Sequence, residues 1–149
     1  MTKSLPYSLF HEYYYQWSLK KKFTSHSHAL YEIYYFHGGK GDFLLGGDSI
    51  ALQPGDLIIM DGLAPHGPKV QAGDEYVRSM FQFDPSVIRY FDERLHGFNP
   101  LLPFERLLHC HIRLAGEYKA EFEDILQRLN RFYVQRDKGL YCGQIETRV

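Results

Sequence analysis

Three histidines and one glutamate have residue types and spacings that suit a metal site. His26 and His28 are separated by one residue, Glu32 follows four positions later, and His66 comes after the turn Pro54–Asp56. Residues i and i+2 of a strand point to the same face, so the two neighbouring imidazoles can reach one ion. Such a set leaves coordination positions open for water or substrate, and it suits divalent Ni, Zn, Fe or Mn.

Glu32 lies too far along a straight strand to share an ion with His28. Four residues of extended chain span about 13 Å. We therefore expect the chain to bend near Ala29, so that Glu32 belongs to the next strand. If Glu32 faces inward, Tyr34 and Phe36 share its face and become candidate ligand contacts.

The segments around these residues have the pattern of a small antiparallel β protein. Turn sequences rich in glycine, proline and aspartate recur at short intervals and separate short runs of β-forming residues. His66 must then arrive from a strand of its own, and the four candidate metal ligands should line the interior. We expect strands over residues 30–37, 42–45, 49–52, 57–60, 75–83 and 107–114, and a short helix within 86–97.

Arg78 is a further candidate ligand contact. The predicted strand 75–83 alternates, with apolar residues on one side and Arg78 and Gln82 on the other. An arginine that faced inward would favour a carboxylate or phosphate on the ligand, whereas the alternative is an ordinary surface position. For Tyr34 and Phe36 the corresponding alternative is plain core packing.

Residues 117–135 have the periodicity of an amphipathic helix, with acidic residues early and arginines late, as the helix dipole favours. Its apolar face must be buried, either on the β domain or against a second subunit. We expect dimerisation through four residues of this face: Phe122, Leu126, Leu129 and Tyr133. A second periodic pattern starts at Leu140 and runs to the end without a cap, so we expect either that the chain is a fragment of a longer protein or that a second helix is very short.

Composition and charge narrow the classes of protein. The 149 residues suffice for one domain with a core, and a net charge of −1 offers no field for nucleic acid or anionic membranes. No apolar run suits a membrane span and no signal peptide is evident, so we expect a cytoplasmic protein without a membrane partner. Cys110 and Cys142 should be free thiols, and His109–His111 should be a partly exposed strand rather than a second metal site.

The spacing of the candidate ligands resembles the paired motifs of the cupin family. The matching residues of H-x-H-x3-E-x6-G and G-x10-H are His26, His28, Glu32, Gly39, Gly55 and His66. The departures lie in turns and flanks, where cupins often have Gly, Pro, Gly and Asn; this chain has Lys20, Asp61, Leu63 and Val70. The four ligand positions themselves are intact. The departures therefore argue against a relationship to cupin enzymes more than against a cupin fold.

More narrowly, residues 7–149 resemble the N-terminal sensor domain of AraC-family transcription regulators. The resemblance implies a mainly β domain over 1–115, a cupin-like double-stranded β-helix or jelly-roll barrel, followed by a helical dimerisation segment over 116–149. It implies a bacterial regulator that forms a homodimer and binds a small-molecule effector, sugar-like or aromatic. It would bind DNA only through a C-terminal domain that this sequence lacks.

Two other functions remain open at this point. One is a metal-dependent cupin enzyme, such as a sugar isomerase or a dioxygenase. The other is a metal-free binding module with no DNA partner. Sensor domains of this kind often keep motif residues while binding an organic ligand without metal, so metal occupancy is a separate question from fold.

Overall fold

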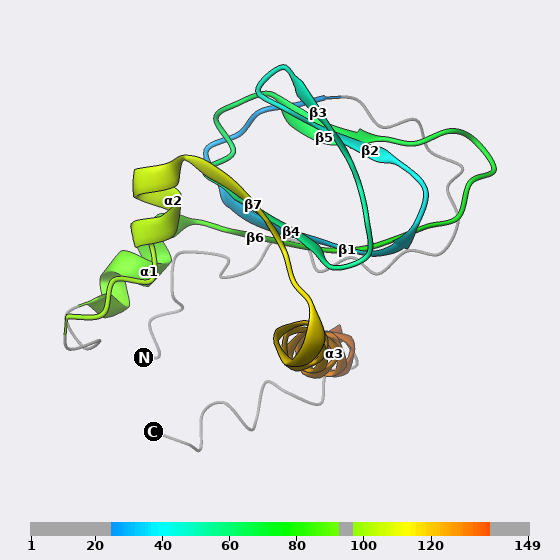
Figure 1. Ribbon diagram of the computed structural model, residues 1–149. Helices are drawn as coiled ribbons and strands as arrows, with labels where there is room; N and C mark the ends of the chain where they lie inside the picture. The colour runs from blue at the N-terminus through cyan, green and yellow to red at the C-terminus, as the bar shows by residue number, and fades with distance from the viewer. Residues whose placement is uncertain (1–24, 93–96, 138–149) are drawn as a thin grey trace. The chain divides into compact units, whose positions relative to one another are not determined.

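The computed structural model describes residues 25–92 and 97–137, and that part of the chain is mainly β with a C-terminal helix (Figure 1). The chain divides into two compact units, residues 1–113 and 114–149, which are described separately. The elements are β1 (Tyr31–Gly39), β2 (Asp42–Leu45), β3 (Asp48–Ala51), β4 (Asp56–Met60), β5 (His66–Lys69), β6 (Tyr76–Phe83), α1 (Pro85–Asp92), α2 (Leu102–Leu107), β7 (His109–Arg113) and α3 (Gly116–Asp137).

The strands of the first unit form two antiparallel sheets that face each other (Figure 1). One sheet has the order β6-β1-β4-β7 and the other has the order β3-β2-β5. The longest strand, β1, lies between β4 and β6, so its inward side chains occupy the middle of the larger sheet. The mainly β class predicted from the turn spacing is confirmed at this level.

The strand register decides which side chains face the interior. Glu32 pairs with Gln82 on β6 and with Met60 on β4. Two residues further along β1, Tyr34 pairs with Met80 on β6 and with Ile58 on β4. Successive side chains alternate between faces, so the even-numbered residues of β1 point between the sheets. The buried apolar residues of this interior are Tyr34, Phe36, Phe43, Leu45, Leu52, Ile58, Met60 and Tyr76. The predicted inward face of Glu32, Tyr34 and Phe36 is therefore confirmed.

The other face of the larger sheet is also covered. Phe83 packs there with Leu101 and with Phe104 of the short helix α2. The rings of Phe83 and Phe104 meet edge to face at 5.5 Å. Because both faces of β6 are buried, the alternation of apolar and polar residues in its sequence does not mark an inside and an outside.

Most predicted boundaries agree with the structure to within two residues. The strand over 42–45 is found as predicted, and the helix expected within 86–97 begins at Pro85. Helix α2 was not predicted, because its six residues are too few to show helical periodicity. The last strand, β7, is shorter than the predicted 107–114 because α2 occupies the residues before Leu108.

A buried carboxylate joins β4 to the end of the first unit. Asp56 is 0 % exposed and accepts hydrogen bonds from Arg113 Nε at 2.8 Å and from the Gln53 backbone N–H at 2.7 Å. His111 Nε2 lies 3.0 Å from the same carboxylate. Burial by itself would raise the pKa of Asp56, but Arg113, the Gln53 amide and His111 outweigh it and lower that pKa below its usual value of 3.8.

Replacing Asp56 with asparagine should cost about 1–2 kcal/mol of unfolding free energy at pH 7. The variant loses a charge-assisted bond, but the half-exposed Arg113 can return to water. A lowered folded pKa means that the ionised carboxylate stabilises the fold above pH 3.8 and ceases to do so as the pH falls through the folded value. Urea unfolding should therefore show a difference between wild type and D56N that shrinks below pH 4. A difference that does not change with pH would contradict this role.

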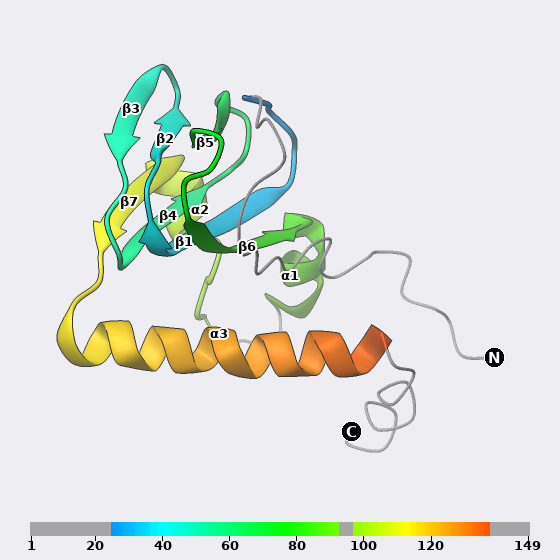
Figure 2. The same ribbon diagram turned by 90° about the vertical axis from the view of Figure 1, so that its right-hand side faces the viewer.

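Helix α3 makes up the described part of the second unit, and Figure 2 shows it as one continuous helix. It agrees with the helix predicted over 117–135. Arg128 pairs with Asp124 at 2.7 Å and Lys119 with Glu123 at 3.9 Å, both one turn apart. The pattern that begins at Leu140 lies outside the described residues. No helix in the described ranges combines the length and apolar character that a bilayer crossing requires.

Candidate metal and ligand site

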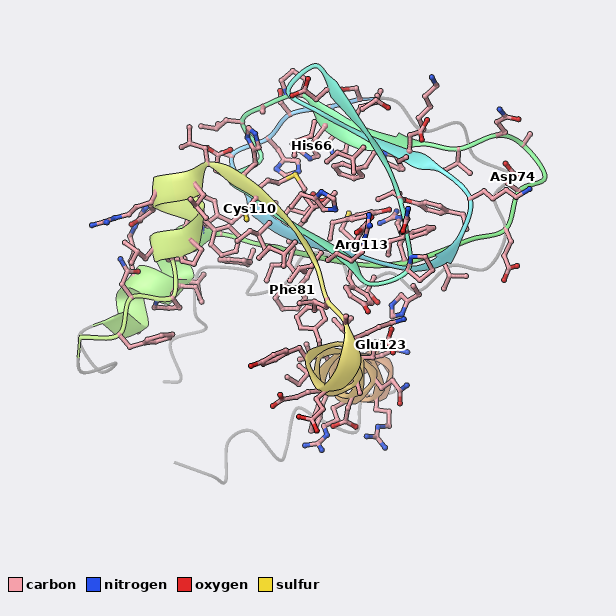
Figure 3. All side chains as sticks on the ribbon, in the orientation of Figure 1. His66, Asp74, Phe81, Cys110, Arg113 and Glu123 are labelled. Carbon is pink, nitrogen blue, oxygen red and sulfur yellow. The ribbon has the colours of Figure 1, made fainter. Side chains whose placement is uncertain are left out.

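The structure brings the four predicted metal ligands together. One ligand atom each from His26, His28, Glu32 and His66 lies within 4.8 Å of the others. The chain bends at residues 29–30, as predicted, which lets Glu32 on β1 return towards His28. A pair of backbone hydrogen bonds, both 2.9 Å long, ties His26 to His66 at the start of β5. Figure 3 shows His66 between the two sheets.

The four residues differ sharply in burial. Glu32 is 2 % exposed and His66 is 1 % exposed, whereas the His28 side chain is partly buried. His26 is exposed, so the prediction that all four line the interior is wrong for this residue. His26 lies before β1, where an isolated bridge pairs it with His66 and its ring contacts the rings of His28 and His66. The site therefore has two buried members, with His28 and His26 at its edge.

Hydrogen bonds orient two of the imidazoles with their Nε2 atoms towards Glu32. His28 Nδ1 donates to the Leu30 carbonyl at 3.0 Å, and His66 Nδ1 donates to the Ala64 carbonyl at 2.8 Å. A carbonyl oxygen only accepts, so each ring carries a hydrogen on Nδ1. In the neutral ring the Nε2 lone pair is then directed at the site, which is the arrangement that metal-binding histidines adopt.

Acceptor atoms outnumber donors where these groups meet. Glu32 Oε2 lies 3.2 Å from His28 Nε2 and 3.5 Å from His66 Nε2. The His66 Nε2 atom is fully buried and has no hydrogen-bond partner among the described residues. Burying such an atom without a partner costs about 1–3 kcal/mol. A cation would satisfy the three facing acceptors together, so the residues fit a metal ion.

The charge states of Glu32 and His66 agree with a cation-binding site. Burial works to raise the pKa of Glu32, but the neighbouring imidazoles of His28 and His66 and the hydrogen bond from Gln82 outweigh it and lower that pKa to about 2. Burial works to lower the pKa of His66, but Glu32 and the Ala64 carbonyl outweigh it and raise that pKa. The buried carboxylate is therefore ionised at neutral pH, and it attracts a positive charge to His66, whether proton or metal.

The sequence reasoning missed Gln82 as a member of the site. Its side-chain amide donates to Glu32 Oε2 at 2.8 Å and lies 3.1 Å from His28 Nε2. Gln82 stands directly opposite Glu32 in the β1–β6 register. The only signal in the sequence is the alternation of residues along strand 75–83. It places Gln82 on the same face as Arg78 but does not show whether that face points to the interior.

A second polar group lies further along the same interior face. Arg78 is 6 % exposed and pairs with Phe36 across β1 and β6, so it is not at a surface position. The Tyr34 and Tyr76 hydroxyls share a hydrogen bond. Burial raises the pKa of Tyr34 well above its usual value and that of Tyr76 to about 12. The interior thus has a histidine–carboxylate group towards one end of the strands and a tyrosine–arginine group towards the other.

Gly62 supports the site from the loop between β4 and β5. Its φ is +80°, and its carbonyl accepts the His28 backbone N–H at 2.9 Å. A Cβ atom at this position would lie 2.5 Å from His28 Nδ1 and 2.3 Å from the Leu30 carbonyl oxygen. Glycine is therefore required here both for the backbone angle and for the close approach of His28.

The remaining cysteine and histidine cluster takes no part in the site. Cys110 is half-buried and free, and His109 and His111 are exposed on β7, as the sequence predicts. Among the described residues, the only group of three or more candidate metal ligands is the one around Glu32. The predicted dimerisation residues Phe122, Leu126 and Leu129 lie on α3, as does Tyr133, whose side chain is outside the described part.

The fold and this site together define a small β domain with polar groups gathered between two sheets. A family model for the AraC-like ligand binding domain matches residues 6–138. The chain therefore belongs to the family of AraC-like ligand binding domains, as the motif resemblance implies. Comparison with curated proteins found no significant match. Family membership supports a sensing role in transcription regulation, with a small-molecule effector, rather than an enzymatic one.

Proposed function

We propose that this chain is the effector-sensing and dimerisation domain of a bacterial transcription regulator that works in the cytoplasm. The observation that carries the proposal is the polar interior of a domain in this family. Buried polar groups are costly unless they are satisfied, and they are a common way to fix the orientation of a ligand. The effector would bind between the facing sheets, which we assign to a cupin-like jelly-roll barrel over residues 1–115.

We propose that a divalent metal ion occupies the group formed by Glu32, His28 and His66, with His26 as a ligand at the edge. The buried acceptor His66 Nε2 supports this, as does the donor set of imidazoles and one carboxylate. When bound, the ion supplies a Lewis acid that can hold an oxygen atom of the effector. Glu32 supplies the compensating negative charge.

The tyrosine–arginine group would recognise the other part of the effector. A guanidinium favours a carboxylate or phosphate, and the rings of Phe36 and Phe43 favour a flat or sugar-like body. The effector would then shift the population of domain arrangements, and so the arrangement of DNA-binding domains carried elsewhere in the full-length protein.

Arg78→Met should reduce binding of an acidic effector about tenfold or more, because it removes a charge-assisted hydrogen bond. Native mass spectrometry against a panel of small sugars and aromatic carboxylates provides the measurement. The matched control is Arg106→Met, since Arg106 is exposed on α2. If Arg78→Met and Arg106→Met bind the acidic panel members equally well, the effector does not use this group.

We propose that the α3 face of Phe122, Leu126, Leu129 and Tyr133, on which Leu126 is already buried within the single chain, contributes to the homodimer contact in segment 116–149. Leu129→Glu should weaken the dimer, because it places a charge in an apolar interface. Sedimentation equilibrium measures the shift towards monomer. Gln127→Glu on the exposed side of the helix is the control and should leave the dimer intact. A wild-type chain that is monomeric at high concentration would contradict the proposal.

A further inference from the structure

We propose that Gln82 controls metal binding at the site, by occupying in the metal-free protein the lone pair of His28 that the ion requires. The inference rests on the metal site proposed above and adds to it a residue that is not a ligand. It assigns Gln82 a positioning role that acts through Glu32 and His28.

The geometry fixes how the Gln82 amide is oriented. Its terminal atom lies 2.8 Å from Glu32 Oε2, and an ionised carboxylate oxygen only accepts, so that atom is the NH2 nitrogen. The same nitrogen lies 3.1 Å from His28 Nε2. In the neutral form of His28 the ring hydrogen lies on Nδ1, which donates to the Leu30 carbonyl, so Nε2, 3.2 Å from Glu32 Oε2, accepts from Gln82. The two hydrogens of one amide therefore bridge two of the metal ligands.

An ion can bind only if this bridge opens on one side. Glu32 has two oxygen atoms and can keep its hydrogen bond from Gln82 while it coordinates a metal through the remaining lone pairs. His28 has one lone pair on Nε2, so Gln82 and the ion compete for it. The Gln82–Glu32 bond holds the amide in place, because Gln82 is 8 % exposed and lies opposite Glu32 in the register.

The burial pattern supports a competition rather than a simple structural bond. Gln82 satisfies Glu32 and His28 but does not satisfy His66, whose Nε2 atom has no hydrogen-bond partner among the described residues. Without an ion, the acceptors of the site are therefore only partly satisfied. Removing the amide should leave two further acceptors unsatisfied and so increase the gain from binding an ion.

Gln82→Met tests the inference, since methionine has similar length and cannot donate a hydrogen bond. Calorimetric titration with Ni²⁺ should show binding about fivefold to tenfold tighter than in wild type, the equivalent of one hydrogen bond of about 1 kcal/mol. In the metal-free protein, the ¹⁵N signal of His28 Nε2 should move downfield towards that of an unbonded acceptor. Gln71→Met, at an exposed turn position, is the control.

The outcomes separate the two proposals. An unmoved His28 signal, or Ni²⁺ binding that is equal or weaker in the variant, overturns the competition and leaves Gln82 as an ordinary structural residue. If neither protein binds Ni²⁺, the metal site itself is wrong and the competition falls with it; a moved His28 signal would then show that the bridge exists. Should the methionine variant fail to fold, Gln82→Asn shortens the side chain and should have the same direction of effect.

Discussion

Replacing His66 with alanine should weaken Ni²⁺ binding by more than about 100-fold. His66 is the most deeply buried imidazole of the site, and its Nε2 atom is already directed at Glu32 by the hydrogen bond from Nδ1 to Ala64. Loss of groups that only orient a metal ligand costs about 10–100-fold in affinity, so loss of a buried ligand should cost more. Imidazole sites bind Ni²⁺ more tightly than Mn²⁺ or Fe²⁺, which makes it a sensitive probe.

The controls for this experiment are other histidines of the same chain. His109→Ala, on the exposed part of β7, should leave the affinity unchanged. His26→Ala should have a smaller effect than His66→Ala, because His26 is exposed and its contribution is shared with water. Elemental analysis of protein purified without chelators provides an independent measurement. Equally low metal content in wild type and in the His66 variant would mean that the motif is a relic.

Gly62→Ala should lower the unfolding free energy by about 3 kcal/mol or more, a large effect for a single methyl group. A φ of +80° alone costs a non-glycine residue about 1–2 kcal/mol. The new Cβ would also meet the Leu30 carbonyl oxygen at 2.3 Å and the His28 carbonyl oxygen at 2.7 Å, and backbone atoms cannot move aside cheaply. The loop or the segment that carries His28 must therefore shift.

Gly73→Ala separates the two causes. Gly73 has a φ of +93°, but a Cβ there meets nothing within 4 Å, so this variant shows only the cost of the backbone angle. Urea unfolding of both variants should give a clearly larger loss for Gly62→Ala, and Ni²⁺ affinity should fall only in that variant. Equal losses of stability in the two variants would mean that the contact with His28 is not essential.

The sequence located the metal-ligand group because its signals are local. Two histidines at i and i+2, and a glutamate that can join them only after a bend, predict a convergence that short-range geometry explains. The bend at residues 29–30 and the inward face of β1 agree with that reasoning. Strand boundaries were predictable for the same reason, since glycine and proline turns interrupt the chain wherever a strand ends.

The burial of polar residues was less predictable. Arg78 had a surface position as its alternative and is buried, whereas His26 was expected inside and is exposed. Alternation along β6 shows which residues share a face, but not which face is inward, because α2 and its neighbours cover the other side. Only the register between β6 and β1 shows that Arg78 and Gln82 share the inward face of the sheet with Phe36 and Glu32.

The sequence alone therefore determined the class of fold, the family resemblance and the identities of the four candidate metal ligands. Only the tertiary structure decided that Gln82 bridges Glu32 and His28, that Gly62 must be a glycine, and that Asp56 joins β4 to Arg113. The physical reason is the distance along the chain. Turns, strand periodicity and ligand spacing are set by near neighbours, whereas these contacts join residues about 30 to 60 positions apart through strand register and burial.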